Sequence, residues 1–155
     1  MKKAFTLIEL LIFMGILAAL LGILSQILAS ALAVQVESQT ASSVHSDGRY
    51  LLSRLTYDVR RASNITSPAS AGLTSPTLTL TISGSPYTYA LSGTDLQLTT
   101  PSSTDNLNSF ATQVSAFSVS RLGNSNGEPT ITVSFTVTDR SVSENFQTTI
   151  STRTN

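Results

Sequence analysis

The sequence opens on an apolar run, AFTLIELLIFMGILAALLGIL, that covers residues 4–24. Within it, only the side chains of Thr6 and Glu9 can form hydrogen bonds. A helix of this length, at about 1.5 Å per residue, is roughly 31 Å long, close to the thickness of the hydrocarbon core of a bilayer. The run therefore predicts an apolar helix that can cross a membrane.

Basic residues flank the apolar run on its N-terminal side. Lys2 and Lys3 precede it directly, and the next basic residue is Arg49. Positive charge close to a membrane helix is retained in the cytoplasm. We therefore expect a cytoplasmic N-terminus and export of everything after about residue 30.

Three interpretations of the run are open. An ordinary signal peptide could be cleaved after Ala31-Leu32-Ala33, so that the mature chain begins at Val34. The second interpretation is a plain membrane anchor. It leaves unexplained why the chain places the charged Glu9 side chain in the membrane, at a cost of a few kcal/mol. The third interpretation gives the Glu9 carboxylate a function.

Residues 2–12, KKAFTLIELLI, resemble the leader and mature N-terminus of the type IV pilin and pseudopilin superfamily. In that family a prepilin peptidase removes a short basic leader just before a Phe, whose new amino group is methylated, and the fifth mature residue is a Glu. The resemblance implies cleavage between Ala4 and Phe5, N-methylation of Phe5, and an assembly role for Glu9. The family usually has Gly before the cut, where this chain has Ala4.

The resemblance also implies how such a subunit assembles. A charge in lipid needs a partner, and this chain offers none within one or two helical turns of Glu9. In the family the carboxylate meets the N-terminal ammonium of a neighbouring subunit entering the filament. Two small-residue pairs, Gly15 with Ala19 and Ala18 with Gly22, would let helices approach closely, although such residues are common in membrane helices.

Helical patterning continues beyond the apolar run. An apolar stripe formed by Val44, Leu51, Leu55, Val59 and Ala62 predicts an amphipathic helix packed on a domain, so that one helix extends from residue 5 to residue 63. Gly48 could mark a bend or a local break in it. Major pilins commonly carry a Pro in the membrane half, and the first Pro here is Pro68, which favours a minor pilin or pseudopilin.

The charged residues of the amphipathic half are expected on its solvated face. This set is Asp47, Arg49, Arg54, Asp58, Arg60 and Arg61. Arg54 and Asp58 are four residues apart and can form an ion pair.

After residue 63 the pattern changes from helix to strands. Residues 64–76 are rich in Ser, Ala and Thr and predict a loop. Apolar residues then alternate with Thr and Ser, which predicts antiparallel strands at 77–82, 87–91, 96–98, 114–122, 131–137 and 146–150. One apolar face of this sheet would cover the helix stripe, and the hydroxyl-rich face would meet solvent.

The expected fold class is α+β, with a long N-terminal helix packed on a C-terminal antiparallel β-sheet head. Its parts are a leader at 1–4, a transmembrane or filament-core helix at 5–29, an amphipathic helix at 30–63 and the head at 64–155. This layout is that of the pilin superfamily. Residues 49–62, 89–96 and 146–153 also resemble J-type minor pseudopilins and the minor pilins called W.

Composition excludes several other functions. Nine basic residues balance nine acidic ones, so no basic footprint for nucleic acid exists. The single His45 has no Cys, second His or acid at ligand spacing, and no catalytic triad can be proposed. Gly123–Glu128 fits a hairpin turn better than a calcium site, and Asp105–Asn108 fits a surface loop. We expect no enzyme activity, no cofactor and no metal.

The implied partners are prepilin peptidase, other pilin or pseudopilin subunits through the N-terminal helix, the inner-membrane assembly machinery and membrane lipid. The implied location is the bacterial inner membrane, crossed once, and a periplasmic or cell-surface filament after assembly. The rival interpretation is a secreted or membrane-anchored β-rich binding or adhesion domain, which in its secreted form is a soluble product starting at Val34.

Overall fold

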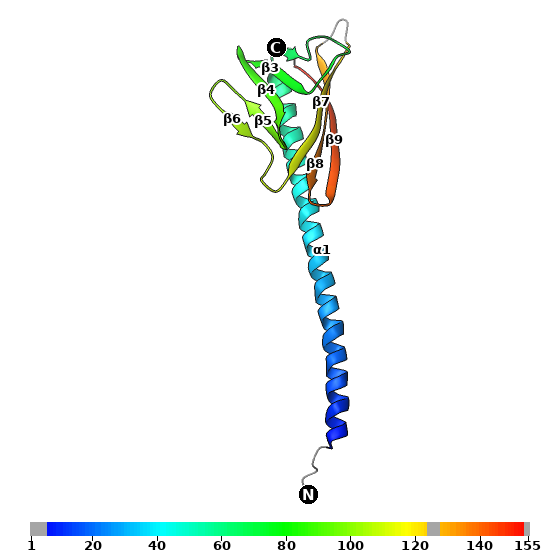
Figure 1. Ribbon diagram of the computed structural model, residues 1–155. Helices are drawn as coiled ribbons and strands as arrows, with labels where there is room; N and C mark the ends of the chain where they lie inside the picture. The colour runs from blue at the N-terminus through cyan, green and yellow to red at the C-terminus, as the bar shows by residue number, and fades with distance from the viewer. Residues whose placement is uncertain (1–5, 124–127, 154–155) are drawn as a thin grey trace. The chain divides into compact units, whose positions relative to one another are not determined.

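The computed structural model describes residues 6–123 and 128–153 (Figure 1). The chain divides into two compact units, residues 1–39 and residues 40–155. The first unit contains the N-terminal part of the helix α1 (Leu7–Arg61), and the second contains the remainder of α1 and all the described strands.

The amphipathic part of α1 in the second unit has the predicted buried stripe. Val44, Leu51, Leu55 and Val59 have no exposed surface, and Ala62, just after the helix, is also buried. Full burial of a Val or Leu side chain stabilises the folded state by about 1.5–3 kcal/mol. This stripe therefore fixes residues 40–61 of α1 onto the strands.

One antiparallel sheet has five strands in the order β1-β3-β4-β5-β6. Its strands are β1 (Asn64–Ser67), β3 (Thr77–Ile82), β4 (Ser85–Ser92), β5 (Asp95–Thr99) and β6 (Thr104–Asn106). The β3–β4 turn is Ser83-Gly84, with both residues at positive φ, which suits the right-handed twist of a two-residue hairpin. Alternate residues of β3 are buried, as the sequence pattern predicts.

A second antiparallel sheet has four strands in the order β2-β7-β8-β9. Its strands are β2 (Thr74–Ser75), β7 (Gln113–Leu122), β8 (Thr130–Asp139) and β9 (Val142–Ser151). Figure 1 shows these strands, yellow to red apart from the short β2, beside residues 40–61 of α1, with the green strands of the first sheet on the other side. Buried residues from both sheets and from the helix form a single core cluster.

The α+β class and the six predicted strands are confirmed, but the sequence predicted one sheet where the structure has two. A single helix stripe can be covered from two sides when each sheet supplies one apolar face. A backbone hydrogen bond joins the two sheets where Val114 of β7 donates to the carbonyl of Thr94, in the turn between β4 and β5, at 2.8 Å.

Two predictions about α1 are wrong. The helix ends at Arg61 and not at residue 63, because the backbone N–H of Ser63 donates to the carbonyl of Thr81 on β3 at 2.8 Å. The suggested break at Gly48 is absent, since α1 is continuous there. Gly48 is buried, and an added Cβ would lie 2.1 Å from the ring of Phe146, so this glycine allows β9 to approach the helix.

Two predicted loops contain short strands. Residues 64–76 include β1 and β2, and Ile65 of β1 is buried in the core. The side chain of Arg121 fixes the following turn by donating to the carbonyls of Ile65, Pro68 and Ala69 at 3.0–3.2 Å. The predicted surface loop 105–108 is wrong as well, because it begins in β6 and ends at the buried Asn108.

Candidate functional site in the N-terminal helix

The first turn of α1 is fixed by Thr6. The backbone N–H of Glu9 donates to the carbonyl of Thr6 at 3.1 Å and lies 3.4 Å from its side-chain oxygen, and Leu10 donates to the same carbonyl at 3.2 Å. Thr6 is therefore the N-cap and Glu9 the third helical residue, the spacing of a capping box. The sequence signal for this cap, Thr-x-x-Glu before an apolar run, was present but was not used in the predictions above.

Glu9 is exposed in the first turn of the helix. A carboxylate is favoured there by the helix dipole, by about 0.3–1 kcal/mol. Within the described residues, its carboxylate has no ion pair and accepts no hydrogen bond. The structure thus presents, on an apolar helix, an acid that the described residues leave unpaired.

The apolar side chains around Glu9 face outward on every side of α1. Every described residue from 6 to 39 is exposed, and the most apolar window of the helix has a mean hydropathy of 2.7 with no part buried. A helix that is apolar all round needs an apolar environment such as lipid or neighbouring helices. By length and composition this helix is able to cross a membrane.

Two serine side chains farther along the helix form hydrogen bonds within it. The hydroxyl of Ser25 donates to the carbonyl of Leu21 at 2.8 Å, and that of Ser30 donates to the carbonyl of Gln26 at 2.9 Å. Such bonds remove hydroxyls that would otherwise lack partners in lipid. Ala4 and Phe5, the predicted cleavage and methylation positions, lie outside the described residues.

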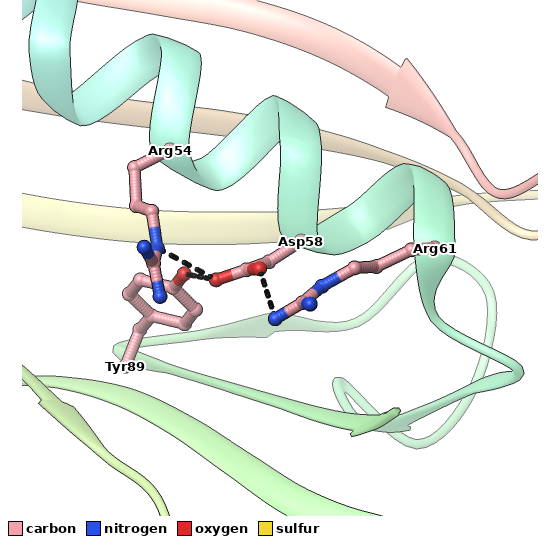
Figure 2. A network of polar contacts seen from close by, with 4 residues as sticks. All are labelled: Arg54, Asp58, Arg61 and Tyr89. Atoms are coloured by element: carbon pink, nitrogen blue, oxygen red, sulfur yellow. Dashed lines mark hydrogen bonds and ion pairs between the residues drawn. The ribbon is translucent and has the colours of Figure 1, made fainter. Parts of the chain in front are cut away.

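A second polar site, shown in Figure 2, lies in the core of the 40–155 unit, where Asp58 of α1 has no exposed side-chain surface. Nε of Arg54 lies 3.1 Å from Oδ2 of Asp58, and the phenol of Tyr89 on β4 donates to the same oxygen. Nη2 of Arg61 lies 2.8 Å from Oδ1, an ion pair whose geometry is not that of a hydrogen bond. Three groups thus surround one buried carboxylate.

This network corrects the prediction that Asp58 lies on a solvated face, while the predicted Arg54–Asp58 pair is confirmed. A sequence signal for burial existed: Leu51, Leu55, Asp58 and Ala62 are spaced by four, three and four, which puts Asp58 on the apolar stripe. Burial, and then the bond to Asp58, raise the pKa of Tyr89, so the phenol keeps its proton and remains a donor.

Two further contacts join α1 to the sheets. Asp47 is half-buried and accepts hydrogen bonds from the backbone N–H of Ser109, at 3.0 Å, and from the hydroxyl of Thr112. Burial opposes ionisation of Asp47, but these bonds outweigh it and lower its pKa. Nδ1 of His45 lies 2.9 Å from Oε2 of Glu144 on β9, so the fold supplies an acid that the sequence did not place near this histidine.

A metal-binding arrangement is not found in the part of the chain that the structure describes. Among those residues no three His, Asp or Glu side chains are grouped to hold a metal ion. The hairpin turn predicted at Gly123–Glu128 lies mostly on residues 124–127, outside the described residues. The side chain of Glu128 accepts a hydrogen bond from Thr152 at 2.9 Å.

Comparison with known families assigns the N-terminal segment. Residues 1–25 match the family model described as the prokaryotic N-terminal methylation motif. The chain matches no curated protein and no solved structure. Together with one long helix and an antiparallel β-sheet domain, the motif supports the type IV pilin and pseudopilin superfamily. It indicates a pilin-like or pseudopilin structural subunit, processed by prepilin peptidase and assembled with other pilins.

Proposed function

We propose that the protein is a minor pilin or minor pseudopilin, a structural subunit of a type IV pilus-like filament or of a type II secretion pseudopilus. The observation that carries this proposal is the methylation motif at residues 1–25, followed directly by a capped, outward-facing apolar helix. The minor type is favoured because no Pro occurs between residues 5 and 63. The likeness to J-type pseudopilins and W-type pilins stays a prediction.

Maturation begins with removal of residues 1–4 by prepilin peptidase, between Ala4 and Phe5, and with methylation of the new amino group of Phe5. Before assembly the subunit crosses the bacterial inner membrane once, with Lys2 and Lys3 on the cytoplasmic side and the head exported. The inner-membrane assembly machinery then moves it from lipid into a filament in the periplasm or at the cell surface.

Glu9 supplies the driving force for entry into the filament. A carboxylate at the centre of a membrane helix costs about 2.5–3.5 kcal/mol on insertion scales, and less near the boundary. Its carboxylate lacks a partner within the described residues, so contact with the N-terminal ammonium of a neighbouring subunit would relieve that cost. The same contact would set the register between subunits.

The experiment that tests this function is the intact mass and N-terminal sequence of the protein recovered from its native membrane. The proposal requires a start at Phe5 with one added methyl group. A start at Val34 would identify a secreted domain and remove the roles given to Phe5 and Glu9. An uncut Met1 would indicate either a plain anchor or inefficient processing at Ala4. Cleavage after Ala33 would also divide α1, which is continuous through that position.

A further inference from the structure

An open hollow of about 620 Å³ lies in the 40–155 unit, at the C-terminal end of α1. Its lining includes Tyr57, Arg60, Arg61, Glu128 and Arg153. Three of the seven arginines in the chain therefore line one concave surface. None of the roles described above uses this surface.

The backbone brings these cations together. The N–H of Arg153, just after β9, donates to the carbonyl of Arg60 at 3.3 Å, so the chain beyond the last strand is joined to the last turn of the helix. Thr152 donates to the carbonyl of Pro129 through its N–H, at 3.1 Å, and to Glu128 through its hydroxyl. The surface is thus built from three segments that are far apart in the sequence.

The hollow carries more positive charge than its structural neighbours neutralise. When the adjoining Asp58 network is included, the described residues here contribute four guanidiniums, those of Arg54, Arg60, Arg61 and Arg153, and two carboxylates, those of Asp58 and Glu128. This leaves two positive charges. The carbonyls at the end of α1 offset only about half a charge.

The arginines differ in how far they are already engaged. Arg61 pairs with Asp58, and its guanidinium lies 4.8 Å from the ring centre of Tyr57 and 5.4 Å from that of Tyr87. The side chains of Arg60 and Arg153 have no ion pair or hydrogen bond within the described residues. Arg61 is held in place, and the other two remain free to bind.

A guanidinium presents several N–H donors in one plane and binds oxyanions through paired hydrogen bonds. We propose that the hollow binds an acidic side chain of a partner protein. The carboxylate of Glu128 in the lining disfavours a doubly charged phosphate, and the exposed ring of Tyr57 offers an apolar surface to the methylene groups of an Asp or Glu. That the partner is another filament subunit rests on the function proposed above.

The test is binding of a fluorescent tetra-glutamate peptide to the full chain in detergent micelles, followed by fluorescence anisotropy. We expect saturable binding that weakens with added salt. The variant Arg60→Gln with Arg153→Gln should bind about tenfold or more weakly, since charge-assisted hydrogen bonds are lost. Arg49→Gln removes the same charge from an exposed helix position outside the hollow and should bind like the unmodified chain.

A gain in binding provides a second readout that does not depend on damage to the fold. Glu128→Gln keeps an oxygen that can accept from Thr152 but removes the negative charge, so it should bind tetra-glutamate severalfold more tightly. Circular dichroism of each variant checks that the helix and sheets are intact. Equal binding by all four proteins would overturn the proposal.

Two other probes distinguish the remaining ligand classes. If inorganic phosphate binds the unmodified chain but not the variant Arg60→Gln with Arg153→Gln, and tetra-glutamate does not bind, the hollow is a phosphate site and the carboxylate assignment is overturned. If the double variant loses binding of a single-stranded oligonucleotide but not of tetra-glutamate, the hollow is a nucleic-acid site. That result would also overturn the carboxylate assignment. The N-terminal mass measurement is independent of these results, because every residue that lines the hollow lies at or after Tyr57, far from the cleavage position.

Discussion

Tyr89 on β4 donates a hydrogen bond to the buried carboxylate of Asp58 on α1. The bond ties the helix to the five-stranded sheet inside the apolar core. The guanidiniums of Arg54 and Arg61 form ion pairs with the same carboxylate. The buried carboxylate therefore depends on its hydrogen-bond and ion-pair partners. Removing one partner from such a set leaves another buried group without its hydrogen bond.

We predict that Tyr89→Phe lowers the free energy of unfolding by about 1.5–3 kcal/mol, the value of a buried hydrogen bond to a charged group. The volume of the side chain is nearly unchanged, so the loss reports the hydroxyl. Thermal unfolding of the full chain in micelles, followed by circular dichroism, measures it. Tyr50→Phe, at a half-exposed position on α1, is the control and should be neutral. Equal melting of both variants would show that the bond contributes nothing.

Gly48→Ala should destabilise the protein by about 1–3 kcal/mol or more, although alanine is the better helix former. The added methyl group would overlap the ring of Phe146, which stacks on Phe135 with 5.7 Å between ring centres. Replacing Phe146 by Leu in the same chain should recover part of the loss. Gly22→Ala, where no atom lies within 4 Å of the added group, serves as the control. The prediction fails if Gly48→Ala melts at or above the temperature of the unmodified chain.

The contacts of Asp47 predict a pH dependence of stability. Its pKa is lowered in the folded chain, so its contribution is present above the unfolded value of about 3.9 and is lost as pH falls through the lower folded pKa. Asp47→Asn should therefore differ most from the unmodified chain at neutral pH, and the two should converge under acid conditions. Melting temperatures measured from pH 7 down to pH 3 check this. A difference that does not change with pH would contradict it.

Glu9→Ala should leave a folded membrane protein that enters filaments at least about tenfold less efficiently, which corresponds to a loss of 1.4 kcal/mol or more per contact. The cause is loss of the proposed contact with the neighbouring N-terminus. Glu37→Ala removes an exposed carboxylate from the same helix and should assemble normally. Filament fractions sheared from cells and probed for the subunit give the comparison. Normal assembly of Glu9→Ala would exclude the assembly role.

The sequence predicts those parts of the fold that repeat with a period. The helix stripe through Leu51 and Leu55 and the alternation in β3 and β8 each combine several residues into one signal, and each is confirmed. The burial of Asp58 was not predicted, because a charged residue is normally assigned to the solvent-exposed face of a helix even where its spacing puts it on the apolar stripe. Its burial is possible only because Tyr89, Arg54 and Arg61 meet it in three dimensions.

Asn108 shows why single polar anchors cannot be found in this way. Its side chain accepts from the N–H of Leu96 at 2.9 Å and donates to the carbonyl of Thr112 at 2.8 Å. These partners lie on both sides of it in the sequence, and no period relates them. The division into two sheets has the same origin, because it depends on how the chain passes from β6 in one sheet to β7 in the other and not on the pattern within any strand.

The N-cap at Thr6 has a consequence for the order of events in the cell. The cut proposed between Ala4 and Phe5 falls before the capping residue, and the first described hydrogen bonds of α1 are accepted by Thr6. Removal of the leader therefore takes none of these bonds from the helix. The helix can therefore begin at the same residue in the precursor and in the mature subunit. Folding of the exported head and removal of the leader can then occur in either order.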